Sequence, residues 1–163
     1  PSWLYPVTQG ATTIWERWDG IRPDGSFQSA GMNSFNHYAY GAIGDWMYQM
    51  VAGLDTDFRE PGYKHVNIHP RPGGGLTYAR AAFDSMYGHT ESQWNYGDDE
   101  FTLRVTIPPN ATATVWVPDA ANREVTESGL PVSQASGVSG VEVEGSDVVI
   151  RIGSGQYTFI TRN

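Results

Sequence analysis

A carboxylate among tryptophans is the feature of this sequence best suited to chemistry. Glu16 lies between Trp15 and Arg17, and Trp18 follows two residues later. Enzymes that cleave glycosidic bonds use a carboxyl group to handle a proton or a water molecule, and indole rings stack on sugar rings. The same stretch would also suit a surface ion pair between Glu16 and Arg17 or Arg22. Spacing alone leaves both interpretations open.

The four histidines give weaker signals. His37 follows an asparagine and precedes a tyrosine, so it fits a hydrogen-bonding role in a site as well as a packing role. His65 and His69 are four residues apart and would share one face of a strand, but no third ligand stands at metal-site spacing. His89 is expected in a loop. We therefore predict no metal site.

Other reactive groups are scarce. The chain has no cysteine, so it has neither disulfides nor a thiolate metal site. Gly73, Gly74 and Gly75 are not followed by the Lys-Ser/Thr pair of a phosphate-binding loop. The acidic run 98–100 is expected to be a solvated turn. No cofactor is predicted.

Composition excludes several classes of protein. The 163 residues carry a net charge of −8, and only Lys64 and nine arginines are cationic. Nucleic-acid binding needs a basic surface, and this charge predicts none. An anionic membrane surface would repel the chain, and no run of 18 apolar residues occurs to span a bilayer. The compartment is not indicated.

One long helix is predicted, and it lies in the aromatic-dense part of the chain, residues 1–54. It is expected to run from about Phe35 to Ala52, and apolar residues recur at helical spacing from Ile43 to Leu54. Asn33 or Ser34 is placed to cap the start, and Gly53 is placed to end the helix in a left-handed conformation. Gly41 and Gly44, three residues apart within it, suggest that another helix packs closely there.

After Asp55 the pattern changes to strands. Apolar residues alternate strictly between Phe101 and Ile107, and similar short runs are separated by turn signals about every ten residues. We expect strands near these positions: 64–69, 77–85, 92–96, 101–107, 111–117, 141–144, 147–152 and 156–161. Such a series is typical of an antiparallel sandwich. The predicted fold is therefore mixed, with a short helical segment at 1–54 and an antiparallel β-sandwich domain at 55–163.

Several stretches resemble a known enzyme family. GATTIWERWDGIRPDG (10–25), MNSFNHYAYGAIGDWMYQMVAGL (32–54) and IHPRPGGGL (68–76) resemble the C-terminal part of bacterial α-L-rhamnosidases, the inverting enzymes of glycoside hydrolase family 78. DDEFTLRVTIPPNATATVWVP (98–118) resembles the C-terminal sandwich of the same family. The similarity covers nearly the whole chain.

The resemblance implies a fold and a role. Residues 1–54 would be the last piece of an (α/α)6 catalytic toroid of six helical hairpins, and 55–163 its C-terminal sandwich. The substrate would be a rhamnose-containing glycoside. Glu16 matches the family's T-x-W-E glutamate, assigned as general base, and His37 matches the N-H-Y histidine that contacts the sugar. Trp15, beside the base, would help to shape the pocket.

The same comparison implies that much of the site is elsewhere. The general acid and most sugar-contacting residues belong to earlier toroid helices, so the partner of this chain would be the N-terminal part of the toroid. Pro1 rather than Met opens the sequence, in keeping with a fragment. We expect the isolated chain to be inactive, and its exposed apolar helix to allow self-association.

Two other functions stay open from the sequence. A free-standing sandwich could bind carbohydrate through an exposed Trp94 or Trp116. It could instead serve a structural role and brace the toroid without a ligand of its own.

Overall fold

The computed structural model describes residues 2–97 and 99–162, so part of the acidic run 98–100 lies outside the described residues. The chain divides into two compact units, Pro1–Gly44 and Asp45–Asn163. The assignment of 1–54 and 55–163 to two parent domains stays a prediction.

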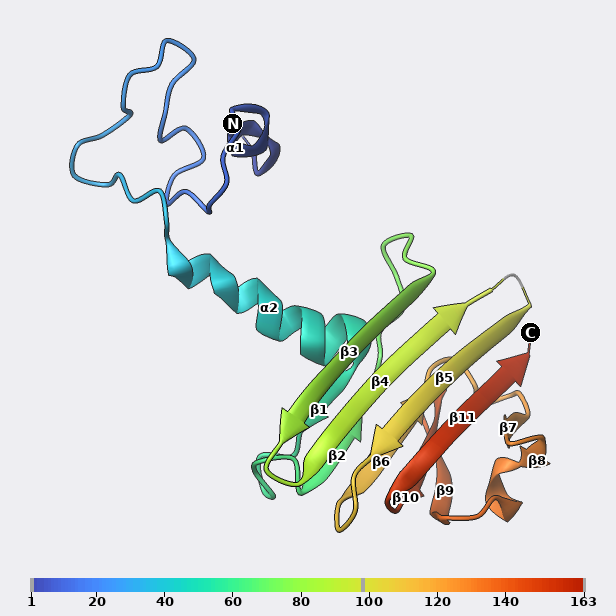
Figure 1. Ribbon diagram of the computed structural model, residues 1–163. Helices are drawn as coiled ribbons and strands as arrows, with labels where there is room; N and C mark the ends of the chain where they lie inside the picture. Colours follow the sequence, from blue (N-terminus) through green and yellow to red (C-terminus); the bar gives the residue numbers. More distant parts are fainter. Residues whose placement is uncertain (1, 98, 163) are drawn as a thin grey trace. The chain divides into compact units, whose positions relative to one another are not determined.

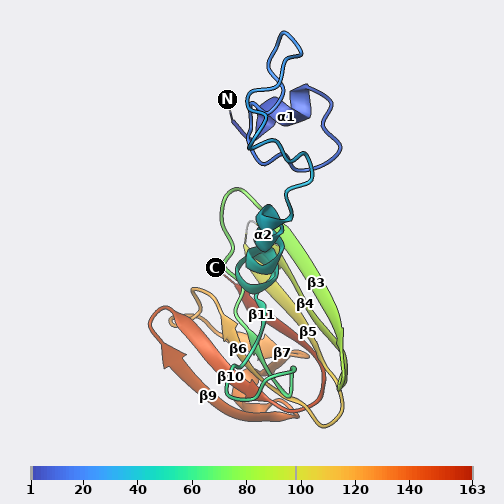
Figure 2. The same cartoon turned by 90° about the vertical axis from the view of Figure 1, so that its left-hand side faces the viewer.

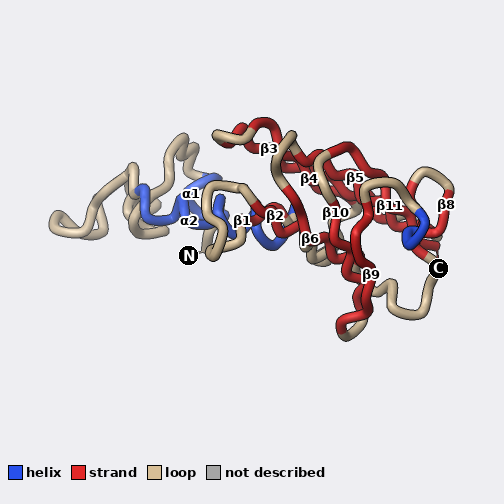
Figure 3. Tube along the Cα trace, turned by 90° about the horizontal axis from the view of Figure 1, so that it is seen from below, coloured by secondary structure: helices blue, strands red, loops and turns tan. Residues whose placement is uncertain are grey.

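The first unit contains little regular structure. Its elements are α1 (Leu4–Thr8), a 3₁₀ turn η1 (Tyr38–Gly41) and the start of α2 (Ala42–Trp46). Loop covers most of the rest (Figure 3). Residues 22–25 form a turn, in which the Gly25 N–H donates to the Arg22 carbonyl at 2.9 Å and Gly25 has φ +80°.

The predicted helix begins later than expected. Helical residues run through η1, α2 and a π-helical turn η2 (Met47–Ala52), so the run starts at Tyr38 rather than Phe35. The proposed caps are wrong: His37 precedes the first turn, and no side chain caps it. Residues 34–37 instead pair with 14–16, which removes them from the helix. The predicted end is confirmed, since Gly53 is left-handed with φ +73°.

The second unit is a sandwich of two sheets (Figures 1 and 2). One sheet has the order β1-β2-β6-β10-β9, and the other β3-β4-β5-β11-β7-β8. The first sheet contains β1 (Leu54–Thr56), β2 (His65–Ile68), β6 (Thr112–Val117), β10 (Asp147–Ile152) and β9 (Val138–Glu144). The second contains β3 (Tyr78–Ser85), β4 (Gly88–Tyr96), β5 (Glu100–Ile107), β11 (Gly155–Arg162), β7 (Val125–Glu127) and β8 (Leu130–Pro131). A 3₁₀ turn, η3 (Val132–Gln134), follows β8.

The predicted sandwich is confirmed, with one departure from antiparallel pairing. β2 and β6 are parallel, with His65 opposite Thr112 and Ile68 opposite Val115. The long separation between these strands in sequence accommodates the crossover that a parallel pair requires. Figure 2 shows β9, β10 and β6 in one layer and β3, β4 and β5 in the other.

The core lies between the sheets. Alternate residues of β5 are buried, as the strict alternation predicted. Fully buried side chains also come from β4, β6, β10 and β11, including Trp94, Val115, Ile150 and Phe159. The prediction of an exposed, sugar-binding Trp94 is therefore wrong.

Trp94 also joins η2 to β4. Its indole N–H donates to the Val51 carbonyl at 2.7 Å, and the Ser92 hydroxyl donates to the Ala52 carbonyl at 2.7 Å. These carbonyls end the helical run and have no partner further along it. Hydrogen bonds from β4 therefore hold the last helical turn against the sheet.

The apolar face of this helical run is exposed. Trp46 and Met47 are about half exposed, at 51% and 54%, and Met50 is 39% exposed. Among the described residues no atom outside the local chain lies within 4 Å of a Cβ built on Gly41 or Gly44, so the predicted close helix packing is not found there. Self-association through this face remains a prediction.

Candidate active site

Hydrogen bonds join two loop segments of the first unit, 13–16 and 34–37, and place the predicted site residues. The Glu16 N–H donates to the Ser34 carbonyl at 2.8 Å, and the His37 N–H donates to the Ile14 carbonyl at 2.8 Å. The Thr13 hydroxyl also donates to the Phe35 carbonyl. Segments 13–16 and 34–37 thereby bring Glu16 and His37 into one region, although they are 21 positions apart in sequence.

The Glu16 carboxylate is held through one oxygen. The backbone N–H of Ser34 donates to Glu16 Oε2 at 3.1 Å, and the side chain is half-buried. Among the described residues, Oε1 accepts no hydrogen bond from the protein. This arrangement fixes the orientation of the carboxylate and leaves one oxygen able to accept a proton from a ligand or a water molecule.

The alternative role for Glu16, a surface ion pair, is not observed. Within residues 2–97 and 99–162, no ion pair includes Glu16. Arg17 instead pairs with Asp19, with 3.7 Å between Arg17 Nε and Asp19 Oδ1, and the Arg22 guanidinium donates to the Gln28 carbonyl at 3.3 Å. Both arginines thus have other partners.

Tyr40 links Glu16 with His37. Its hydroxyl donates to the Glu16 carbonyl at 3.1 Å, and its ring centroid lies 5.5 Å from that of His37. His37 is half-buried, and no direct hydrogen bond between the His37 and Glu16 side chains is found in the described part of the chain. The two predicted residues therefore share a neighbour rather than a bond.

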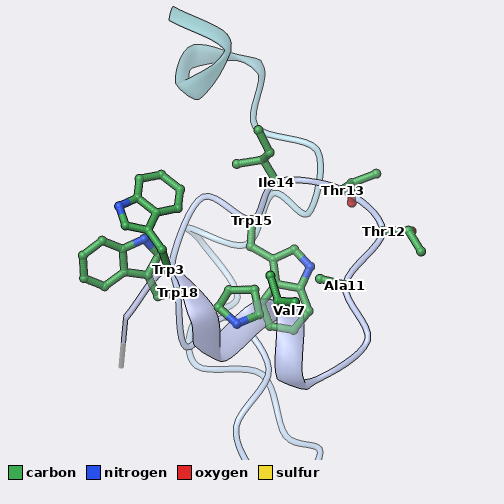
Figure 4. Close-up of a pocket in the computed structure, with 9 residues that line it drawn as sticks. Trp3, Val7, Ala11, Thr12, Thr13, Ile14, Trp15 and Trp18 are labelled. Carbon is green, nitrogen blue, oxygen red and sulfur yellow. The ribbon is translucent and has the colours of Figure 1, made fainter. Parts of the chain in front are cut away.

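Trp15 points into the interior of the first unit. It is only 6% exposed and packs edge-on against Phe35, with ring centroids 5.3 Å apart. Figure 4 shows its indole beside Val7 and Ala11, whereas Ile14 extends away from it. A largely apolar pocket of about 260 Å³ lies here, lined by Trp3, Pro6, Val7, Ala11, Thr12, Thr13, Ile14, Trp15 and Trp18. Neither Glu16 nor His37 lines this pocket.

Sequence reasoning missed Ser34 and Tyr40 as contacts of Glu16. The sequence predicts Ser34 only as a helix cap and gives no signal for a role of Tyr40. They lie 18 and 24 residues from Glu16. No local pattern signals contacts over such separations, so only the fold reveals them.

The remaining histidines serve separate networks in the second unit. His65 contacts the hydroxyls of Thr112 and Thr114 at 2.7 and 2.9 Å. His69 lies just beyond β2 and bonds Asp147. His89 lies on β4 rather than in the predicted loop, between Asp84 and Glu91. No group of three metal-binding side chains is found in the described residues.

The surroundings of His69 favour its neutral form. Its Nε2 lies 3.0 Å from Asp147 Oδ2, and the Arg71 guanidinium lies 3.2 Å from its Nδ1. Burial lowers the pKa of His69, and the nearby Arg71 charge lowers it further against the opposing effect of Asp147. The neutral tautomer that donates from Nε2 and accepts at Nδ1 satisfies both neighbours, so protonation of Nδ1 would break the bond from Arg71.

Asp147 remains ionised beside that histidine. Burial raises the pKa of Asp147, but hydrogen bonds from the Asp119 N–H, the Ser146 hydroxyl and His69 outweigh burial and leave the pKa below its usual value. The His69 ring also stacks on Trp116, with centroids 4.8 Å apart. Trp116 is only partly exposed, and its N–H donates to Glu144. This cluster joins the chain after β2 to β6, β9 and β10.

No helix among the described residues has both the length and the apolar character needed to cross a membrane.

Comparison with known proteins places both units in one family. Residues 1–51 match the bacterial alpha-L-rhamnosidase 6 hairpin glycosidase domain, and residues 53–130 match the bacterial alpha-L-rhamnosidase C-terminal domain. The chain belongs to the bacterial α-L-rhamnosidase family. It corresponds to the junction of these two family domains and confirms the resemblance inferred from the sequence.

Individual α-L-rhamnosidases support the same assignment. The enzyme of Streptomyces avermitilis is 46% identical over 160 residues, which is 98% of this chain and 14% of the relative. An α-L-rhamnosidase of Formosa agariphila is 45% identical over 118 residues, or 72% of this chain and 12% of the relative. The chain thus spans about one seventh or less of the length of these α-L-rhamnosidases.

Solved α-L-rhamnosidase structures agree. The Streptomyces avermitilis α-L-rhamnosidase complexed with L-rhamnose aligns with a TM-score of 0.81 and 45% identity, over 98% of this chain and 15% of that one. The α-L-rhamnosidase from Dictyoglumus thermophilum aligns with a TM-score of 0.82 and 33% identity, over 98% of this chain and 17% of that one. The helical segment and sandwich are therefore parts that recur in α-L-rhamnosidases.

Proposed function

We propose that this chain is the C-terminal part of an inverting α-L-rhamnosidase and that Glu16 is its general base. The reaction is hydrolysis of terminal α-L-rhamnose from glycosides or polysaccharides. The observation that carries the proposal is the Glu16 carboxylate, held by the Ser34 N–H at Oε2 with Oε1 left without a protein partner among the described residues. The α-L-rhamnosidase names of the relatives, and the L-rhamnose bound to one of them, support the choice of sugar.

In this mechanism Glu16 acts on water. The ionised Oε1 accepts a proton from a water molecule as the water oxygen attacks the anomeric carbon of rhamnose. A general acid on the opposite face donates a proton to the departing glycosidic oxygen. Glu16 ends the step protonated and the acid ends it ionised, and the product has inverted configuration.

His37 and Trp15 support this step in different ways. His37 is half-buried beside Tyr40, where its ring can hydrogen-bond a sugar hydroxyl. Trp15 is buried against Phe35, so it shapes the site by fixing the backbone that carries Glu16 rather than by stacking on the sugar. Trp15 therefore shapes the sugar-binding site indirectly, through the backbone of Glu16.

The general acid and most of the sugar pocket belong to the parts of the enzyme that precede this chain in the family. Catalysis by inversion needs both carboxyl groups, with space for a water molecule on one side. We expect the isolated 163 residues to show no hydrolysis. The sandwich braces the toroid in this proposal and has no ligand of its own.

The test is substitution of Glu16 in the full-length enzyme. Glu16→Gln keeps the shape of the side chain but removes the base, so kcat on an aryl α-L-rhamnoside should fall by at least about 10³-fold, with Tm unchanged, as expected for loss of general base and water positioning together. Glu60→Gln is the matched control, because Glu60 is an exposed glutamate of the second unit, and it should leave kcat unchanged. A Glu16→Gln enzyme within tenfold of the parent would refute the role.

A further inference from the structure

The surroundings of Glu16 include one side chain that touches both proposed site residues. Tyr40 lies on η1, and its hydroxyl donates to the Glu16 backbone carbonyl at 3.1 Å. Its ring centroid is 5.5 Å from the His37 ring. The Tyr40 ring also packs edge-on against the ring of Trp3, with the two ring centroids 5.1 Å apart. Tyr40 is therefore constrained at both its ring and its hydroxyl.

The main chain of Glu16 is fixed on both sides of its Cα atom. The Glu16 N–H donates to the Ser34 carbonyl at 2.8 Å, and the Glu16 carbonyl accepts from Tyr40. With the Ser34 N–H on Oε2, three hydrogen bonds hold one residue. Two of the three come from the backbone of Ser34. The Tyr40 bond is the one that a side-chain substitution can remove.

We propose that Tyr40 is a positioning residue for the general base: its hydroxyl fixes the backbone of Glu16 while its ring holds His37 beside it. The inference rests on the proposed function of Glu16. It adds that the orientation of the base relative to the sugar-binding histidine depends on a phenol that does not itself take part in proton transfer. A base must lie within hydrogen-bond reach of the attacking water, and small displacements are costly.

Tyr40→Phe isolates this role. The variant keeps the ring, so the contacts with Trp3 and His37 remain, and it removes only the bond to the Glu16 carbonyl. Tyr5→Phe is a matched control in the same unit, because the Tyr5 hydroxyl donates to a backbone carbonyl, that of Ile21, at 2.8 Å without touching Glu16.

In the full-length enzyme, Tyr40→Phe should lower kcat on an aryl α-L-rhamnoside by roughly 10- to 100-fold, the range expected when a catalytic group is misplaced by about 1 Å or less. KM should change by less than about threefold, because sugar contacts outside Glu16 remain. Tyr5→Phe should leave both kcat and KM unchanged. Binding of L-rhamnose, measured by calorimetry, should be retained in Tyr40→Phe, which also shows that the unit is folded.

The decisive comparison repeats Tyr40→Phe in a Glu16→Gln enzyme. A residue that acts through Glu16 has no further effect once the base is gone, so the second substitution should leave the residual rate unchanged. An equal loss of kcat in both backgrounds would show that Tyr40 acts on the sugar directly and would overturn the proposal. So would a Tyr40→Phe enzyme with the parent kcat, or one that loses L-rhamnose binding together with kcat.

The two proposals, for Glu16 and for Tyr40, can be refuted by different results. If Glu16→Gln alone keeps kcat within tenfold, Glu16 is not the base and Tyr40 has no base to position. If Glu16→Gln abolishes turnover and Tyr40→Phe does not reduce it, only the role of Tyr40 is overturned.

Discussion

Gly53 is the position where a single added methyl group should do most damage. It ends the helical run in a left-handed conformation, with φ +73°, directly before β1. A Cβ atom built there would lie 2.0 Å from Pro70 N and 2.5 Å from Pro70 Cα. Ordinary contacts begin at about 3.4 Å, and the atoms in the way are backbone atoms that cannot rotate aside.

The cost of Gly53→Ala has two parts. A left-handed conformation costs a residue with a Cβ about 1–2 kcal/mol. Displacing Pro70 would also strain two backbone hydrogen bonds, from the His69 N–H to the Gly53 carbonyl at 2.8 Å and from the Arg71 N–H to the Met50 carbonyl at 2.9 Å. Each is worth about 1 kcal/mol. We therefore expect a loss of about 3–4 kcal/mol in the free energy of unfolding of the sandwich, a large share of the ~5–15 kcal/mol typical of a domain.

Urea unfolding followed by circular dichroism of the strands measures this loss. With an m-value of about 1.5 kcal/mol per molar, the midpoint should fall by about 2 M. Gly129→Ala is the control, since Gly129 has φ +80° and no atom within 4 Å of an added Cβ. It should lose only the conformational part, about 1–2 kcal/mol. Equal losses in the two variants would refute the argument from close approach.

Two further predictions concern the sandwich. Trp94→Phe should lower the free energy of unfolding by about 2–3 kcal/mol, because it leaves the Val51 carbonyl without its partner. Trp116→Phe is the control and should lower the free energy of unfolding by less than about 1 kcal/mol, because Trp116 is partly exposed. Urea unfolding measures both losses, and similar losses in the two variants would contradict this prediction. The lowered pKa of His69 means that the folded state favours the neutral imidazole. The contribution of His69 to the free energy of unfolding is therefore present above about pH 6.5, the pKa of an unfolded histidine, and is lost as the pH falls through the folded pKa. The stability advantage of the parent over His69→Gln should therefore shrink between pH 8 and pH 5, and an advantage that grows over that interval would show the opposite shift.

The fold could be predicted where the signal is local. The strict alternation of apolar and polar residues between Phe101 and Ile107 predicts β5, and its apolar residues are buried as expected. The short strands β1, β7 and β8 have two or three residues each, too few to show a period. The parallel pairing of β2 with β6 joins residues 47 positions apart, for which no local pattern exists.

The start of the helix shows the same limit. The cap residues Asn33 and Ser34 predict a start at Phe35. Backbone hydrogen bonds from Glu16 to Ser34 and from His37 to Ile14 instead hold 34–37 outside the helix, and this long-range pairing outweighs local helix preference. Glu16 could be singled out because its neighbours are tryptophans in sequence. Tyr40 could not, because its contact with Glu16 is made only in the folded chain.

Trp94 illustrates why exposure could not be predicted. A tryptophan in a strand can face either the core or the solvent, and here Trp94 faces the core, where its N–H also donates to the Val51 carbonyl. That bond depends on where the helical run ends relative to β4. The interpretation of Trp94 as a sugar-binding side chain failed because its binding partner is the protein itself.

We propose that Glu16 acts on water and not on the sugar. Proton NMR during the first turnovers of the full-length enzyme on an aryl α-L-rhamnoside distinguishes these roles. A general base gives inversion, so β-L-rhamnose should appear first and reach the equilibrium mixture of anomers later. If α-L-rhamnose appeared first, the reaction would retain configuration, and a general-base role for Glu16 in an inverting mechanism would be contradicted.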